Sequence, residues 1–382
     1  MTTSLWKNLP QPIIGLAPMD GVTDSAFRYI VASYGKPDIV FTEFTNVHDI
    51  CSGRLKTLDS LRYSEVERPI IAQIYGKDPS LFYQAAQVVC ELGFDGLDIN
   101  MGCPSKNVAS SGSGAGLIRT PNLALELMDH ARKGIHDWAD GQKLTAIGLK
   151  PGALQTIAQL KAEHPELTEC RERLSIPLSV KTRLGFDSNI IDEWSDCLIQ
   201  GRPEAIAIHG RTLSQMYRGQ SDWEAIAQAA TRIQRHGIVA LGNGDIKSLA
   251  EGQQRIQESG VNGALIGRGA LGNPWIFQKI HLIREALATG ISLEHKKSEP
   301  NMEEQFQAMI KHAQCFEAIH GTERFVRMRK HLGWYCSSFP HAAAMRAQMV
   351  RTNGSQDVIT ILQAYLATHE AIEDPAFETT PA

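Results

Sequence analysis

The chain lacks the features that would place a protein in a membrane, outside the cell or around a structural metal. No window approaches the roughly 18 uninterrupted apolar residues of a membrane-spanning helix, and the start, MTTSLWKNLPQP, lacks the basic and apolar segments of a signal peptide. The seven cysteines lie far apart, without a C-x-x-C pair or a Cys/His pair at zinc spacing. We therefore expect a cytoplasmic protein with neither a disulfide framework nor a metal.

Acidic residues are missing from one region of a chain that is acidic as a whole. The formal net charge of -4 argues against indiscriminate nucleic-acid binding. Between residues 324 and 351, however, there is no Asp or Glu, while the basic residues are Arg324, Arg327, Arg329, Lys330, Arg346 and Arg351. Such runs are often only solvated faces. Because this one is interleaved with Trp334 and Tyr335, it favours a surface for an anionic partner, with nucleic acid as the leading candidate.

Short apolar runs rich in β-formers alternate with amphipathic stretches along most of the chain. The runs span residues 13–19, 38–44, 69–76, 96–100, 178–184, 205–211, 238–245 and 263–269. Near-continuous apolar strands are typical of a parallel sheet that is covered on both faces. Eight such units within roughly 250 residues predict a (β/α)8 TIM barrel, with a doubly wound open sheet as the competing architecture.

Composition changes after the last of these runs. We expect a barrel domain over residues 1–290, a linker over 291–302, a small all-α bundle over 303–372 and a tail over 373–382. Helices of the bundle are expected over 303–319, 324–335, 341–350 and 357–368. A long connection, 136–175, precedes the fifth strand. Because helix-to-strand connections lie on the bottom face of a barrel, we expect it to affect stability or contacts more than chemistry.

Polar or unusual side chains occupy the same end of every predicted strand. These ends carry Pro18 with Met19, Glu43, Gln73, Asn100 with Cys103, Lys181 with Arg183, His209 with Arg211, Asn243 with Asp245, and Arg268. A barrel builds its site only at the C-terminal ends of its strands, so eight such ends favour one shared site.

The last two predicted strands end in glycine-rich turns, 242–245 and 267–272. In barrels, the loops after strands seven and eight commonly bind phosphate through backbone N–H groups. The second turn also matches the dinucleotide fingerprint G-x-G-x-x-G. That fingerprint requires an acidic residue at the end of a second strand, whereas the candidate here, Glu285, falls in a helical pattern. We therefore favour the barrel phosphate site over a Rossmann unit or a plain tight turn.

A single thiol follows the fourth predicted strand, in the segment 98–117, DINMGCPSKNVASSGSGAGL. A free cysteine is often an inert, buried side chain. The polar surroundings of Cys103, which include Asn100 and Lys106, are unlike the apolar sites of inert cysteines. Cys103 is therefore a candidate to meet a ligand.

Together these motifs resemble the tRNA-dihydrouridine synthases, flavin enzymes that reduce a uridine in the D-loop of tRNA. The matching stretches are APMDGVTDSAFR (17–28), TEF (42–44), AQIYG (72–76), DINMGCPSKNV with GSGAGL (98–117), VKTRLGFD (180–187), IHGRTLSQMYRGQSDW (208–223), GNGDI (242–246) and GRGALGNPWIF (267–277). The chain departs from the family pattern in its long 136–175 segment, and in Asn107 where a second basic residue is common.

The resemblance implies FMN at the barrel end and NADPH or NADH as reductant. The residues implied for FMN are Pro18, Met19 and Asp20 along the ring, Gln73 at its pyrimidine edge, Lys181 beside N1 and O2, His209 between ring and ribityl chain, and Asn243, Gly244, Asp245, Gly267 and Arg268 at the ribityl and phosphate end. Cys103 is the implied acid that protonates C5 of the uracil while hydride reaches C6.

The resemblance also implies contacts to the tRNA substrate. The residues implied are Asn100, Arg183 and Tyr217 around the flipped base, with Lys106 as a further substrate contact. Within the acid-free basic run, Arg327, Arg329 and Lys330 are the candidates to bind tRNA phosphates. We expect a monomer that binds tRNA and neither a membrane nor a metal.

Two other functions stay open at this point. A small-molecule flavin barrel similar to the dihydroorotate dehydrogenases would use the same hydride chemistry, but it has no use for a basic helical region. A non-catalytic RNA-binding barrel is the other, and the intact set Gln73, Cys103, Lys181, His209 and Arg268 argues against it.

Overall fold

Eight parallel strands close into a barrel in sequence order, with β1 hydrogen-bonded to β8. The computed structural model describes residues 5–53, 58–163, 173–293, 300–337 and 339–370. The strands are β1 (Ile13–Leu16), β2 (Ile39–Asn46), β3 (Ile70–Tyr75), β4 (Gly96–Met101), β5 (Leu178–Arg183), β6 (Ala205–His209), β7 (Val239–Asn243) and β8 (Gly263–Ile266). The predicted TIM barrel is confirmed, and the open sheet is excluded.

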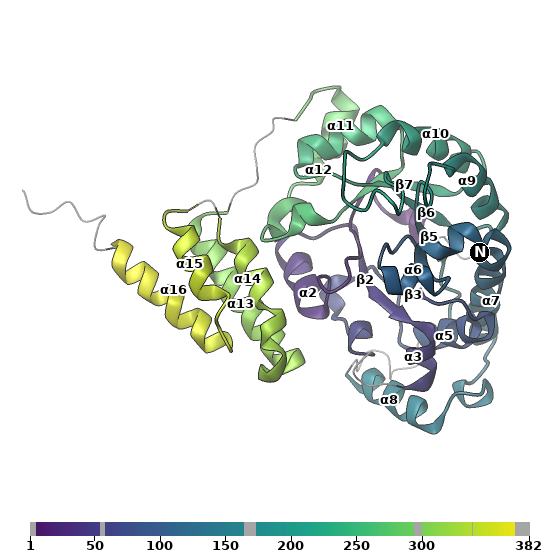
Figure 1. Ribbon diagram of the computed structural model, residues 1–382, viewed down its shortest axis with the longest axis horizontal. Helices are drawn as coiled ribbons and strands as arrows, with labels where there is room; N and C mark the ends of the chain where they lie inside the picture. Colours follow the sequence, from purple (N-terminus) through teal and green to yellow (C-terminus); the bar gives the residue numbers. More distant parts are fainter. Residues whose placement is uncertain (1–4, 54–57, 164–172, 294–299, 338, 371–382) are drawn as a thin grey trace, which may run out of the picture. The chain divides into compact units, whose positions relative to one another are not determined.

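Helices surround the strands on the outside of the barrel (Figure 1). The helices of this unit are α1 (Leu5–Asn8), α2 (Ser25–Tyr34), α3 (Val47–Ser52), α5 (Pro79–Glu91), α6 (Lys106–Ser110), α7 (Pro121–Ala139), α8 (Pro151–Ala162), α9 (Ile191–Gln200), α10 (Trp223–Gln234), α11 (Leu249–Ser259) and α12 (His281–Thr289). Short 3-10 segments are η1 (Asp59–Leu61), η2 (Glu65–Glu67), η3 (Gly114–Arg119), η4 (Leu144–Ala146), η6 (Arg268–Ala270) and η7 (Pro274–Phe277). None of the described helices combines the length and apolar composition that crossing a bilayer requires.

The interior of the barrel changes from apolar to polar along each strand. At the N-terminal ends of the strands, Trp6 packs with Ile71 and Leu241 in a buried cluster that closes this end of the barrel. Side chains two residues apart share one face of a strand, so the next inward positions are Gln73 after Ile71 and Asn243 after Leu241. The same inward face thus forms the core at one end and presents polar groups at the other, which we call the mouth.

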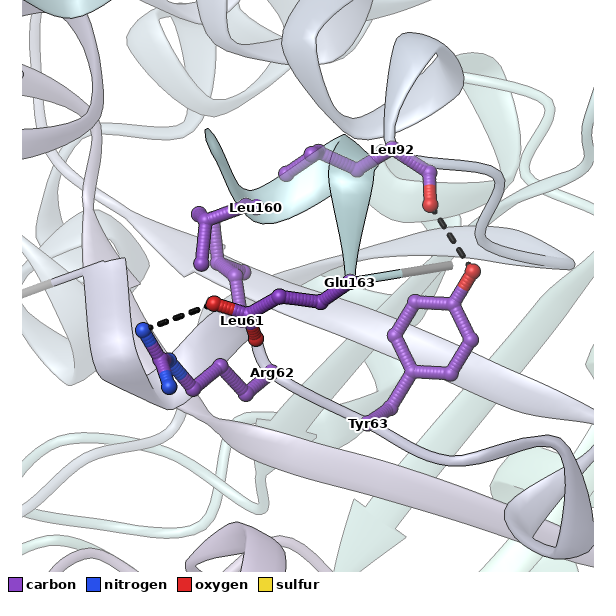
Figure 2. Close-up of a pocket in the computed structure, with 6 residues that line it drawn as sticks. All are labelled: Leu61, Arg62, Tyr63, Leu92, Leu160 and Glu163. Atoms are coloured by element: carbon purple, nitrogen blue, oxygen red, sulfur yellow. Dashed lines mark hydrogen bonds and ion pairs between the residues drawn. The ribbon is translucent and has the colours of Figure 1, made fainter. Parts of the chain in front are cut away.

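The long connection before β5 packs on the outside of the barrel. Helix α7 continues to Ala139, so the predicted start of the connection at residue 136 lies inside this helix. In α8, Leu160 lines a narrow crevice with Leu61 and Leu92, and Glu163, directly after this helix, forms an ion pair of 2.9 Å with Arg62 (Figure 2). Leu61 and Leu92 precede β3 and β4, so the end of α8 lies beside the N-terminal ends of these strands. Part of the connection, residues 164–172, lies outside the described residues.

The remaining residues form a second compact unit made of helices. It comprises residues 271–275 and 298–382, while residues 1–270 and 276–297 form the barrel unit. Its helices are α13 (Met302–His320), η8 (Thr322–Arg327), α14 (Arg329–Tyr335), α15 (Ala342–Met349) and α16 (Ser355–Glu370). The sequence pattern assigned residues 271–275 to the barrel. They pack instead against α14, since a Cβ on Gly272 would lie 2.3 Å from the carbonyl oxygen of Trp334.

One predicted helix of this unit is two segments. The sequence predicts a single helix over residues 324–335, but η8 ends at Arg327 and α14 begins at Arg329. Phe325 and Met328 are both buried, and the Met328 N–H donates to the Phe325 carbonyl at 2.8 Å. Because residues three apart share a face in a 3-10 helix, this tighter turn buries both side chains together.

We predict that Glu91 at the end of α5 holds the connection in place. Its carboxylate accepts hydrogen bonds from the Trp138 indole at 2.8 Å and the Lys161 ammonium at 2.6 Å. Glu91→Ala should lower the free energy of unfolding by about 1–3 kcal/mol, because these donors lose their acceptor. Urea unfolding measures this loss, with Glu126→Ala on the exposed side of α7 as control. Equal losses in the two variants would contradict the role of Glu91.

Candidate active site

Cys103 lies just beyond the end of β4, at the mouth of the barrel, and is 7% exposed. The side chain of Asn100 holds the loop that carries it, since its Oδ1 accepts from the Gly102 N–H at 3.0 Å and the Cys103 N–H at 2.8 Å. Burial raises the pKa of the Cys103 thiol, which therefore keeps its proton at neutral pH.

The Gly/Ser-rich stretch after Cys103 contains the short segments α6 and η3. Gly114 begins η3 with φ +57°, where a Cβ would lie 3.2 Å from the Cβ of Cys103. A Cβ on Gly116 would lie 2.6 Å from the carbonyl oxygen of Ala109. Glycine at these positions therefore lets η3 pack directly against α6 and the thiol. Lys106 begins α6, but its side chain lies outside the described residues.

A chain of buried hydrogen bonds runs from Asp98 to the Cys103 loop. Asp98 accepts from Ser179 Oγ at 2.7 Å and from Gln73 Nε2 at 2.7 Å. Gln73 Oε1 in turn accepts from Asn100 Nδ2 at 2.8 Å. Asp98 and Ser179 were not among the predicted site residues. The signal that could have found Asp98 is a carboxylate within an apolar strand, on the same face as Asn100.

This series of hydrogen bonds determines which donor and acceptor groups of Asn100 remain for a ligand. An amide side chain has two acceptor sites and two N–H donors. The backbone of residues 102 and 103 uses both acceptor sites of Asn100, and Gln73 uses one of its donors. The second N–H of the Asn100 amide makes no hydrogen bond to any of the described residues. Asn100 can therefore donate to a ligand but cannot accept, which suits a carbonyl oxygen.

Cationic side chains from β5 lie beside the hydrogen-bonded residues Asp98, Gln73 and Asn100. Lys181 donates to Asn243 Oδ1 at 3.1 Å, and Arg183 donates to the Gly102 carbonyl at 2.6 Å. Burial and the nearby guanidinium of Arg183 lower the pKa of Lys181 to about 8. Burial, with the same cations, lowers the pKa of His209 to about 2, so its imidazole is neutral. The mouth thus holds fixed positive charge with a neutral histidine.

Asp245, two residues beyond the end of β7, joins two arginines. Its Oδ2 accepts from Arg211 Nη2 at 2.6 Å and its Oδ1 from Arg268 Nη2 at 3.0 Å. The carboxylate is thereby committed to the arginines, so it orients Arg268 and does not itself offer a contact to an anion. The preceding Gly244 has φ +133°, and a Cβ there would lie 2.1 Å from Ser221 Oγ. Only glycine fits at this position. Within the described ranges, no three His, Cys, Asp or Glu side chains are grouped to hold a metal ion.

The turn after β1 is shaped by residues of the 17–28 stretch that the sequence reasoning did not assign to the site. Thr23 Oγ1 accepts from the Met19 N–H at 2.9 Å and bonds to the Met19 carbonyl at 3.1 Å. Arg28, fully buried in α2, donates to the Thr23 carbonyl at 2.7 Å and pairs with Glu67 at 2.7 Å. This support holds the predicted site residues Pro18 and Met19, whereas Asp20 is exposed.

The other predicted site residues are more exposed. Tyr217 is 61% exposed, and the Arg268 guanidinium carbon lies 5.3 Å from the centre of its ring. In the helical unit, Arg327 and Lys330 are exposed. Arg329 is half-buried and donates to the Thr352 carbonyl and to Asn353 Oδ1, each at 2.8 Å. Arg329 therefore stabilises the helical unit to which it belongs.

We predict that the charge on Asp98 reduces stability. Burial raises the pKa of Asp98 to about 6, whereas an unfolded chain ionises it at about 3.9. The folded state binds more protons between these values, so its stability is greatest below the lower value and is lost as pH rises through the higher one. Asp98→Asn keeps an acceptor for Gln73 and gives Ser179 a donor, but carries no charge.

Asp98→Asn should therefore be more stable than wild type by up to about 3 kcal/mol at pH 8, and by about half as much at pH 5. Urea unfolding at the two pH values measures the difference. Asp129→Asn, on the exposed side of α7, should show no such trend. A difference that does not grow with pH would mean that Asp98 is not the ionising group.

Comparison with known proteins places the chain in one family. The model of the family described as Dihydrouridine synthase (Dus) matches residues 15–137 and 159–372, which leaves residues 138–158 of the long connection unmatched. The chain is 36% identical over 287 residues to the probable tRNA-dihydrouridine synthase 2 of Bacillus subtilis strain 168, covering 73% of this chain and 75% of the relative. It is 29% identical over 377 residues to the probable tRNA-dihydrouridine synthase of Staphylococcus aureus strain COL, covering 96% and 97%. The chain belongs to the dihydrouridine synthase family.

Proposed function

We propose that this protein reduces the C5=C6 bond of a D-loop uridine in tRNA, giving 5,6-dihydrouridine. The observation that carries the proposal is the buried thiol of Cys103, whose pKa is raised by burial, next to an Asn100 amide whose acceptor sites are both used. The reaction adds a hydride at C6 and a proton at C5, so it needs an acid beside the base and donors for its carbonyl oxygens. The protein would act in the cytoplasm as a monomer.

The residues at the mouth fit FMN. Lys181, half-buried beside Arg183, would hold the pyrimidine end of the flavin and would supply a fixed cation that stabilises the negative charge of its reduced form. Arg268 suits a phosphate group because Asp245 holds its guanidinium in place, and Gly244 allows the loop to turn at φ +133° beside Ser221. Gln73, His209, Asn243, Gly267 and the turn from Pro18 to Asp20 complete the proposed cofactor site. When bound, reduced FMN supplies the hydride, and NADPH or NADH is the proposed reductant.

The protein groups around the base would bind its carbonyl oxygens and donate the proton. Asn100 donates its one N–H to a uracil carbonyl oxygen, and Arg183 offers further donors, so the pair favours uracil over a base with an amino group at that edge. Tyr217 and Lys106 are proposed as further contacts to the substrate. The thiol of Cys103 gives its proton to C5, and solvent returns a proton to the thiolate afterwards. Because burial raises the pKa of the thiol, the acid form is present at neutral pH.

The helical unit is proposed to bind the tRNA backbone. Arg327 and Lys330 are exposed on a stretch that contains no acidic residue between 324 and 351. Such a surface attracts phosphates through charge and does not read sequence. Arg329 belongs to the same proposed surface but also holds residues 352 and 353. A small-molecule pyrimidine oxidoreductase would have no need of this surface.

Cys103→Ala tests the acid. The variant should still be reduced by NADPH, because the flavin contacts are unchanged, but its reoxidation by tRNA should slow by about 10² to 10⁴. Stopped-flow flavin absorbance measures both half-reactions. Cys197→Ala, which changes a half-buried thiol on α9, is the matched control and should behave as wild type. Reoxidation of the Cys103 variant at the wild-type rate would require another acid.

Arg327→Ala combined with Lys330→Ala tests the RNA surface. If both side chains contact phosphates, the slope of log K against log salt should flatten by about 0.7–0.9 for each lost contact. Reduction of the flavin by NADPH should not change. Fluorescence anisotropy of labelled tRNA over a salt series measures the slope. Arg235→Ala combined with Lys143→Ala removes the same charge from exposed positions of the barrel unit. Equal slopes in the two double variants would mean that the region is only a solvated face.

A further inference from the structure

Besides Arg268 on Tyr217, a second arginine lies over an aromatic ring at the same end of the barrel as Cys103. This second pair has no role in the proposed reaction. The Arg119 guanidinium carbon lies 3.5 Å from the centre of the Phe186 ring. Arg119 ends η3, which begins at Gly114 against Cys103. At about 2.0 Å per residue in a 3-10 helix, Arg119 lies about 10 Å along η3 from that contact. The feature is therefore close to where the target uridine would bind.

Three loops hold this pair in place. Arg119 Nη2 forms an ion pair of 2.5 Å with Asp187, and Asp187 accepts from Ser214 Oγ at 2.9 Å. The Ser214 N–H also donates to the carbonyl of Phe186 at 2.9 Å. The loops after β4, β5 and β6 thus fix both the ring and the guanidinium. A side chain already held in its bound geometry loses little conformational entropy when a ligand arrives.

The exposed face of Arg119 suits a nucleobase better than a phosphate. Phe186 covers one face of the planar guanidinium and Asp187 binds Nη2, but the side chains of Arg119 and Asp187 are still 58% and 64% exposed. The Asp187 carboxylate offsets the positive charge and would repel a phosphate at this place. Stacking does not depend on net charge in the same way, since every base has a π-face and guanidinium planes are common stacking partners.

We propose that Arg119, supported by Phe186, is a stacking contact for an unpaired base of the tRNA close to the modified uridine. This inference rests on the proposed function, because it assumes a tRNA substrate with a splayed D-loop. Its contribution is to binding and positioning of the RNA, and it takes no part in hydride or proton transfer.

Binding of the full chain to labelled tRNA, measured by anisotropy at several salt concentrations, tests the contact. Arg119→Ala should weaken binding about tenfold to a hundredfold, with an unchanged slope of log K against log salt. Arg119→Lys keeps the charge but loses the planar group, so it should lose most of the same affinity. Arg232→Ala, which breaks comparable ion pairs of α10 with Asp192 and Asp196 on α9 but leaves Arg119 and Phe186 in place, is the matched control and should bind as wild type.

Removal of single bases from the D-loop of the tRNA identifies the partner. At one position, the abasic tRNA should bind wild type about as weakly as intact tRNA binds Arg119→Ala, and the two changes together should cost no more than either alone. A flatter salt slope for Arg119→Ala would overturn the inference in favour of a phosphate contact. Unchanged affinity in a folded Arg119→Ala would reduce the pair to a structural link between loops.

Dihydrouridine in the product tRNA is measured in the same samples. Wild type that binds tRNA but forms no dihydrouridine would overturn the proposed function, and the binding comparison would still decide on the stacking contact. Wild type that binds no tRNA would overturn both.

Discussion

The hydrogen bonds that link Asp98, Gln73 and Asn100 inside the barrel are the constraint on which the site depends. They join three neighbouring features, the buried carboxylate of β4, the amide of β3 and the loop that carries Cys103. Amide groups that could each take two orientations are left with one, because backbone N–H groups fix one end of the chain and a carboxylate fixes the other. The site is thus set by the barrel itself, independently of any ligand.

Charge at the mouth adds a second constraint. Lys181, Arg183, Arg211 and Arg268 are gathered there against the carboxylates of Asp98 and Asp245. Burial, together with the excess of positive charge, lowers the pKa of Lys181 and of Arg183, the latter to about 10. A bound anion would relieve this repulsion, so the arrangement favours an anionic ligand.

Much of this is predictable from the sequence, and the remainder depends on register. The strands are near-continuous apolar runs, and their polar ends mark the mouth directly, so the sequence alone identifies Cys103, Lys181 and His209 as candidates. It cannot identify Ser179, whose role follows from its place opposite Asp98 in the pairing of β4 with β5. Charge alone assigns Arg329 to the proposed RNA surface, and only the fold of the helical unit reveals its contacts with residues 352 and 353. The break between η8 and α14 is equally hidden, since Phe325 and Met328 fit a 3-10 turn as well as an α-helix.

The pairing of β1 with β8 has a consequence for how the chain folds. Ile13 lies opposite Gly263, so the barrel closes only when its first and last strands meet across some 250 residues of sequence. Contacts of such long range slow folding, because much chain entropy is lost before they form. Until β8 is available, β1 and β7 each have an unpaired edge. The buried cluster that contains Trp6 is also incomplete, because it includes Leu265 of β8. During synthesis, the nascent chain must therefore keep two strand edges from pairing with other chains until residue 266 has emerged.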